Sequence, residues 1–179
     1  ATVFKPYVIK TYGKAKVAYI GVSDPQTISK SGASFKNSDG SAAYSFADGQ
    51  DGEALYEKVQ NAIDQAKAEG ADYIIAIGHL STTGEAAYTP KSVLENTSGI
   101  QAFINGNSHT AIAGEEVRTK DGAYALLTCA GAGISNIGVL TISGGKSISS
   151  QLISGYKLRD IKTKDGIDAL TKKYKANLQ

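Results

Sequence analysis

Apolar residues in the first part of the chain form short β-branched runs, separated by one long stretch with helical periodicity. The run from Lys16 to Val22 predicts a buried strand, because it is short, rich in branched residues and bounded by turn residues. The helical stretch starts at Asp51, the expected N-cap, and stops at Gly70. A second strand, Asp72–Ile77, follows at once, so this order predicts a right-handed βαβ unit. The apolar stripe of the helix consists of Leu55, Val59, Ala62, Ile63 and Ala66.

The pattern then continues the parallel sheet and afterwards changes to antiparallel β-structure. A short helix is expected over Pro90–Asn96, since proline is favourable at the first helical position, and a third parallel strand over Ile100–Asn105. Glycine-containing turns at residues 120–122 and 144–145 predict hairpins. We therefore expect an α/β half with three mainly parallel strands, followed by an antiparallel β half. The β segments of the second half are Glu115–Thr119, Ala123–Cys129, Gly138–Ser143 and Lys146–Ile153.

Two segments lie outside this pattern. The stretch from Pro25 to Gly52 is rich in Ser, Gly, Asp and Asn and predicts a surface loop, with a short strand at Ala43–Phe46 as an option. After Tyr156 the chain becomes charged and predicts a final connector helix. We therefore expect residues 1–156 to form the folded domain and residues 157–179 an interdomain linker and helix. The apolar face of that helix consists of Ile167, Leu170, Tyr174 and Leu178.

The composition excludes some partners. The 179 residues carry 19 basic and 17 acidic side chains, a net charge of +2, so neither nucleic acid nor an anionic membrane is expected as a partner. No apolar stretch is long enough to span a bilayer. The single cysteine, Cys129, ends an apolar strand and is expected to be buried and inert. The chain has no methionine and begins at Ala1, so we expect a translation start upstream of it.

The two histidines are the best candidates for chemistry. His79 and His109 each stand at the polar end of an apolar run, and the carboxyl ends of parallel strands form the edge where open sheets bind ligands. Imidazole is a common ligand of transition metals, and Asn107 can project from the same tight turn as His109, with Gly106 allowing close approach. The alternative, given equal weight, is that both histidines cap strands by bonding loop carbonyls.

Other candidates are better explained by structure. Asp24 precedes a proline in a turn and Asp72 opens a strand, so turn and cap roles are expected for both. The glycine-rich run over residues 131–138 lacks the spacing and the following helix of a dinucleotide-binding loop, and predicts a loop or bulge. The sequence shows no recognisable Ser, His and acid grouping.

Four blocks occur in the order and spacing of a known family. The blocks are Lys5–Lys10, Lys16–Thr27, Gly70–Leu80 and Gly99–Thr110. Together they resemble the second half of the calcineurin-like metallophosphoesterase domain of the 5'-nucleotidase family, which includes UDP-sugar hydrolases and 2',3'-cyclic-nucleotide phosphodiesterases. The resemblance implies an α/β, or α+β sandwich, fold flanked by helices: the C-terminal half of a four-layered metallophosphatase fold.

The resemblance also implies a dinuclear metal site in the intact parent protein. Two divalent metal ions (Mn, Zn, Co or Fe) would be held at the sheet edge, with His79 binding one metal and His109 the other. Asn107 stands where the family has a further histidine, and its oxygen is a weaker ligand for a transition metal than imidazole. The metal site is therefore expected to be degenerate, and the fragment is expected to hold metal loosely or not at all.

The resemblance finally implies what this segment lacks. The family's Asp-x-His and Gly-Asn-His blocks are not in this sequence, so we expect a fragment of a secreted or surface nucleotide phosphoesterase of nucleotide catabolism, without catalytic residues and inactive alone. Its parent would be extracellular, periplasmic or at the cell surface. Its partners would be a nucleotide and either the N-terminal half as a second chain or a second copy of itself. The alternatives are a non-catalytic binding or surface protein on the same scaffold, and a self-sufficient small α/β domain.

Overall fold

A computed structural model describes residues 4–27, 35–41, 43–47, 49, 51–83, 86–144 and 147–155. These residues form a six-stranded sheet in the order β1-β2-β3-β4-β6-β5 and a separate β7-β8 hairpin. Neither α-helix in the described ranges is long and apolar enough to cross a bilayer. The elements are β1 (Tyr7–Tyr12), β2 (Ala15–Ser23), α2 (Glu53–Ala68), β3 (Tyr73–His79), the 3₁₀ turn η2 (Ala86–Tyr88), α3 (Pro90–Asn96), β4 (Ala102–Asn105), β5 (Ala111–Arg118), β6 (Tyr124–Ala130), β7 (Asn136–Ser143) and β8 (Ser147–Ser154).

The centre of the sheet is parallel and its two edges are antiparallel. Strands β2, β3, β4 and β6 run in one direction, while β1 pairs with β2 and β5 pairs with β6 in the opposite direction. The predicted α/β class is confirmed by this mixed, mostly parallel sheet. Strand β6 is an additional parallel strand: the chain first runs out to the edge as β5 and then returns between β5 and β4. Alternation of apolar residues marks β6 as a strand but does not encode its neighbour.

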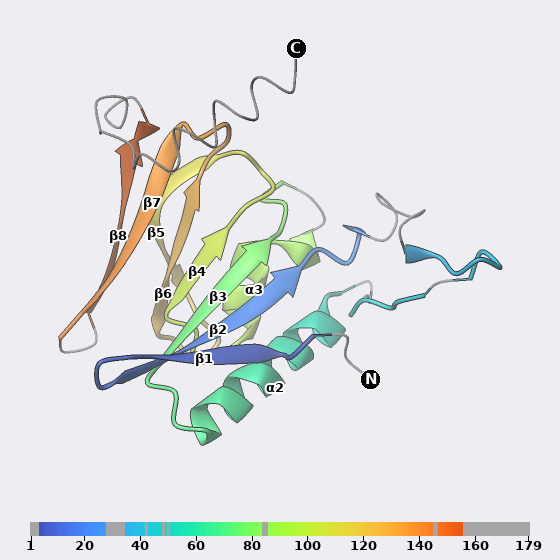
Figure 1. The fold of residues 1–179 in the computed structure, drawn as a ribbon, viewed down its shortest axis with the longest axis horizontal. Helices are drawn as coiled ribbons and strands as arrows, with labels where there is room; N and C mark the ends of the chain where they lie inside the picture. Colours follow the sequence, from blue (N-terminus) through green and yellow to red (C-terminus); the bar gives the residue numbers. More distant parts are fainter. Residues whose placement is uncertain are drawn as a thin grey trace, which may run out of the picture.

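The two faces of the sheet are covered differently (Figure 1). Helices α2 and α3 pack on one face, here called the helix face, whose core includes Ile20, Ile74 and Phe103. The opposite face, here called the open face, has a smaller buried cluster. Only part of it is covered, by Leu140, Ile142 and Ile148 of the hairpin. That smaller cluster consists of Val17, Tyr73, Ile75 and Ala102.

The start of α2 differs from the prediction. Gly52 is the N-cap, in the left-handed region at φ 79°, and Asp51 lies one residue earlier, with its Oδ1 accepting from the Glu53 N–H at 3.3 Å. A Cβ on Gly52 would lie 2.6 Å from the Tyr56 ring and 2.9 Å from the Ala87 carbonyl. Tertiary crowding therefore selects glycine at this position. Gly70 ends the helix as predicted, with its N–H bonded to the Lys67 carbonyl and φ at 85°.

The remaining predicted elements agree with the structure in part. Strand β1 was not predicted, and residues 43–46 form no strand; there Tyr44 and Phe46 pack edge-on against Phe35 instead of pairing with the sheet. Helix α3 matches its prediction, and Thr89 caps it by accepting from the Ser92 N–H at 3.1 Å. The predicted connector helix at residues 157–179 lies outside the described residues.

Candidate functional site

His79 is the last residue of β3, at the carboxyl edge of the parallel strands. Its side chain is exposed, and the alternation along β3 places it on the open face together with Ile75 and Ile77. Its register partner on β2 is Ser23. The structure thus places this imidazole at the carboxyl end of its strand, as predicted.

The turn after β4 passes directly against His79. The Gly106 N–H donates to the Gly78 carbonyl at 3.0 Å, which extends the β3-β4 pairing by one residue. A Cβ on Gly106 would lie 3.1 Å from His79 Nδ1. Glycine at 106 therefore permits the close approach that brings the turn bearing Asn107 and His109 beside the first histidine.

This turn is backbone-strained at both candidate ligands. Asn107 has φ 73°, and the Ser108 N–H donates to the Gly106 carbonyl at 3.0 Å, the hydrogen bond of a three-residue γ-turn. His109 also has a positive φ, 56°. Such conformations are uncommon for residues other than glycine, and they cluster at functional sites when the surrounding structure enforces them. The buried Ser108 hydroxyl has no hydrogen-bond partner among the residues that the structure describes.

The donor set fits a borderline metal only in part. Imidazoles suit Zn, Co or Fe, and an asparagine oxygen is a weaker neutral donor. In the described part of the chain, no three His, Cys, Asp or Glu side chains come together as a possible metal cage. Two neutral imidazoles and an amide supply no negative charge to hold two dications side by side, so these residues do not by themselves fit a dinuclear centre.

The remaining candidates have the structural roles predicted for them. Asp24 is 3% exposed and its Oδ1 accepts from the Gln26 N–H at 2.9 Å, while Asp72 Oδ2 accepts from the Lys16 N–H at 2.8 Å. Of the loop predicted over residues 131–138, residues 131–135 form a loop, whereas residues 136–138 already belong to β7; Cys129 is buried at 1% exposure. Asp24 directly follows Ser23, the register partner of His79, so its turn lies at the same carboxyl edge of the sheet.

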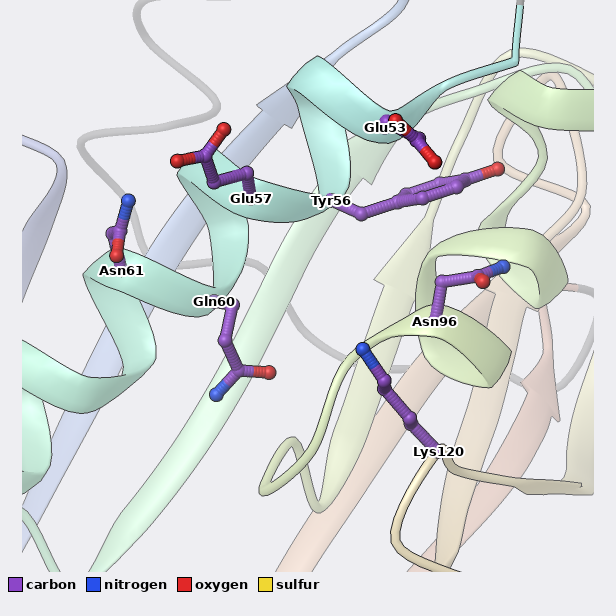
Figure 2. Close-up of a pocket in the computed structure, with 7 residues that line it drawn as sticks. All are labelled: Glu53, Tyr56, Glu57, Gln60, Asn61, Asn96 and Lys120. Atoms are coloured by element: carbon purple, nitrogen blue, oxygen red, sulfur yellow. The ribbon is translucent and has the colours of Figure 1, made fainter.

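A larger cavity lies away from the histidines, among the residues that the structure describes. It measures about 420 Å³ between α2 and α3, and Figure 2 shows Tyr56 and Gln60 extending from α2, with Asn96 and Lys120 on the opposite wall. Gln60 is engaged with the Ser98 backbone, accepting from its N–H at 2.8 Å. Partial burial raises the pKa of Tyr56, whose hydroxyl donates to the Ala87 carbonyl at 2.5 Å. Two of the polar side chains that line this cavity, Tyr56 and Gln60, are thus bonded to the surrounding backbone.

A smaller cavity of about 180 Å³ adjoins the segments that follow the two histidines. Thr82 and Thr110 contribute to its wall, Leu127 is part of its lining, and the Lys91–Glu115 ion pair, at 2.6 Å, stands beside it. This space is large enough for one small chemical group. Of the two cavities described, it is the one whose lining residues follow His79 and His109 most closely in the sequence.

One residue of this region was not predicted. Asn105 is 6% exposed; its Nδ2 donates to the Leu80 carbonyl at 2.9 Å and its Oδ1 accepts from the Leu80 N–H at 3.0 Å. A polar residue closing an apolar strand is the only sequence signal for it, and its partner lies 25 residues away.

Comparison with known proteins is informative at the level of structure alone. No family model and no curated protein match the sequence. The sulfate thiohydrolase SoxB of Thermus thermophilus matches with a TM-score of 0.70 and 18% identity, covering 98% of this chain and 29% of SoxB. The calcineurin-like phosphoesterase YfkN of Bacillus subtilis matches with a TM-score of 0.68 and 20% identity, covering 99% and 59%. The chain shares the calcineurin-like phosphoesterase fold.

A third solved structure agrees. The NAD nucleotidase NadN of Haemophilus influenzae matches with a TM-score of 0.58 and 17% identity, covering 84% of this chain and 26% of NadN. The predicted resemblance is therefore confirmed as a likeness of fold. The chain spans between 26% and 59% of the length of these three phosphoesterase-fold structures.

Proposed function

We propose that this chain is part of a metal-dependent phosphoester hydrolase acting on nucleotides. In it, His79 and His109 bind divalent metal and Asn107 is a weaker neighbouring donor. The supporting observation is the contact of the Gly106 turn with His79, which gathers both histidine-bearing segments at the carboxyl edge of this fold. The names of similar structures, a phosphoesterase and a nucleotidase, support the reaction class.

A bound divalent metal would supply a water of lowered pKa and stabilise charge on the phosphoryl oxygens. This chain would supply metal ligands: β3 carries His79 on a regular strand, the γ-turn carries Asn107, and His109 follows that turn directly. Because no three His, Cys, Asp or Glu side chains come together among the described residues, we expect the 179-residue chain alone to show no enzyme-like turnover. Turnover of a nucleotide by this chain with Mn²⁺ or Co²⁺ would contradict that expectation.

Restoring an imidazole at position 107 tests the metal role. In a Co²⁺ titration followed by visible absorption, Asn107→His should tighten binding on the order of tenfold, about 1.4 kcal/mol. The matched control is Thr110→His, which adds an exposed imidazole to the same segment without replacing Asn107. Equal gains in both variants, or none in Asn107→His, would contradict the proposal.

Asn107 also favours the second candidate, a non-catalytic binding protein on this scaffold whose metal site has decayed. The two differ in Co²⁺ binding by the unaltered chain. Binding that depends on His79, even if weak, supports the hydrolase, whereas no binding before Asn107→His, and recovery after it, supports the binding protein.

Exposed apolar residues on the open face are a reason to expect a protein partner. Val8, Tyr12 and Ile77 are 46%, 58% and 48% exposed on it, next to partly buried Tyr19. Exposed apolar groups on a sheet face favour association. We expect the isolated chain to self-associate or to bind a chain that completes the fold, and Ile77→Asp to reduce this. Light scattering after size exclusion tests it: a dilute monomer of the unaltered chain contradicts the expectation.

A further inference from the structure

Asn105 joins the two strand ends that carry the candidate ligands. Beyond His79 the peptide of Leu80 has no strand partner of its own, and Leu80 is fully buried. The carboxamide of Asn105 supplies both missing hydrogen bonds, at 3.0 Å to the N–H and 2.9 Å from Nδ2 to the carbonyl. The side chain thus replaces a pair of backbone ladder bonds just past the end of β3.

The hydrogen bonds around this carboxamide form a short clamp. Leu80 directly follows His79, and Gly106 directly follows Asn105. The two Asn105 hydrogen bonds and the Gly106 to Gly78 hydrogen bond therefore connect the end of β3 to the end of β4 within a few residues. The Phe103 ring packs closely against Gly78, since a Cβ on Gly78 would lie 2.3 Å from this ring and 3.3 Å from Asn105 Oδ1. The end of β3 and the end of β4 therefore have little room to shift relative to each other.

From this geometry we infer that Asn105 is a positioning residue: it fixes His79 and the turn that starts at Gly106 in one mutual arrangement. The inference rests on the proposed function for its purpose, but its structural part stands independently. Residues that orient a ligand without touching the metal commonly change metal affinity by about 10- to 100-fold. The plainer explanation is that Asn105 only satisfies two buried peptide groups.

Gln101 provides a matched control. Its Oε1 accepts from the Ile74 N–H at 2.6 Å, so it bonds the backbone of β3 from the residue just before β4, at the end of β3 opposite to His79. Asn105→Ala and Gln101→Ala each remove a side chain that bonds the β3 backbone region. Only Asn105→Ala acts beside His79.

The first readout needs no metal. In Asn105→Ala, hydrogen exchange at the Leu80 amide should accelerate by about tenfold or more, and the nuclear Overhauser contact between Gly106 Hα and the His79 ring should weaken. In Gln101→Ala both should stay as in the unaltered chain. If the Gly106 to His79 contact persists in Asn105→Ala, the positioning role is wrong.

The second readout is Co²⁺ affinity. Asn105→Ala should weaken it by about tenfold or more, and Gln101→Ala by less than about twofold. Equal losses in both variants would assign Asn105 a merely structural role. If the unaltered chain binds no Co²⁺, the proposed function fails while the first readout still decides the inference. Should Asn105→Ala not fold, Asn105→Ser, whose single hydroxyl cannot span both Leu80 groups, takes its place in both measurements with the same expectations.

Discussion

The helix face and the open face of the sheet are built from the same strands, yet they differ in how much of their apolar surface is covered. On the helix face, Phe103 is 0% exposed and packs beneath α2 and α3. On the open face, Ile77 is 48% exposed only one strand away. His79 belongs to the open face, two residues beyond Ile77.

The buried core and the candidate ligands thus lie on different faces of the sheet. The helix face supplies most of the buried apolar contacts, whereas the candidate ligands stand where the sheet is least covered. An exposed sheet edge whose strands are packed against helices on the other face can bind a metal or a partner without disturbing the core. Changes on the helix face should therefore affect folding, and changes on the open face should affect binding.

The largest contrast is expected between Phe103→Ala and Ile77→Ala. Removing the fully buried ring should lower the free energy of unfolding by about 3–5 kcal/mol, because it leaves a cavity. Removing the half-exposed isoleucine should lower it by less than about 1.5 kcal/mol. Urea denaturation of both variants measures this, and similar losses would mean that the open face is covered in solution.

Two glycines in neighbouring strands give a second contrast. A Cβ on Gly78 would meet the Phe103 ring at 2.3 Å, so Gly78→Ala should destabilise the fold by about 1–3 kcal/mol through overpacking. Gly21, the register partner of Ile77, has nothing within 4 Å of its Cβ position. Gly21→Ala should therefore stabilise the strand by about 0.5–1 kcal/mol. Opposite signs in thermal unfolding are the expected result; loss in both would place a neighbour over Gly21.

The smallest effect concerns a tyrosine pair on the open face. Partial burial, together with the hydrogen bond from the Tyr19 hydroxyl to the Tyr12 hydroxyl at 3.2 Å, raises the pKa of Tyr19 to about 12. Because this pKa lies above the ordinary 10.0, the group stabilises the fold below pH 10, and that contribution is lost as the pH rises towards 12. Tyr12→Phe should lower the pKa of Tyr19 only in part, since burial is the larger cause. Titration of ¹³C-labelled tyrosine measures this; an unshifted Tyr19 would contradict it.

The periodicity of apolar residues predicted the elements that depend on local sequence. Helix α3 and the βαβ order were accessible because apolar spacing, caps and turn glycines are local. The parallel pairing of β6 and the glycine N-cap of α2 were not, because both depend on contacts with distant residues. His79, Asn107 and His109 could be selected by residue type and position. Asn105 could not, because its role depends on a buried peptide group that sequence does not display.

The central claim, that His79 and His109 bind divalent metal at one sheet edge, is tested most directly by Co²⁺ titration of the full chain and its histidine variants. We predict that His79→Ala and His109→Ala each weaken binding by about tenfold or more and that the double variant abolishes it, while Asn61→Ala, on the exposed surface of α2, leaves it unchanged. Co²⁺ binding that is unaffected by loss of both imidazoles, or no binding by the unaltered chain, would contradict the claim.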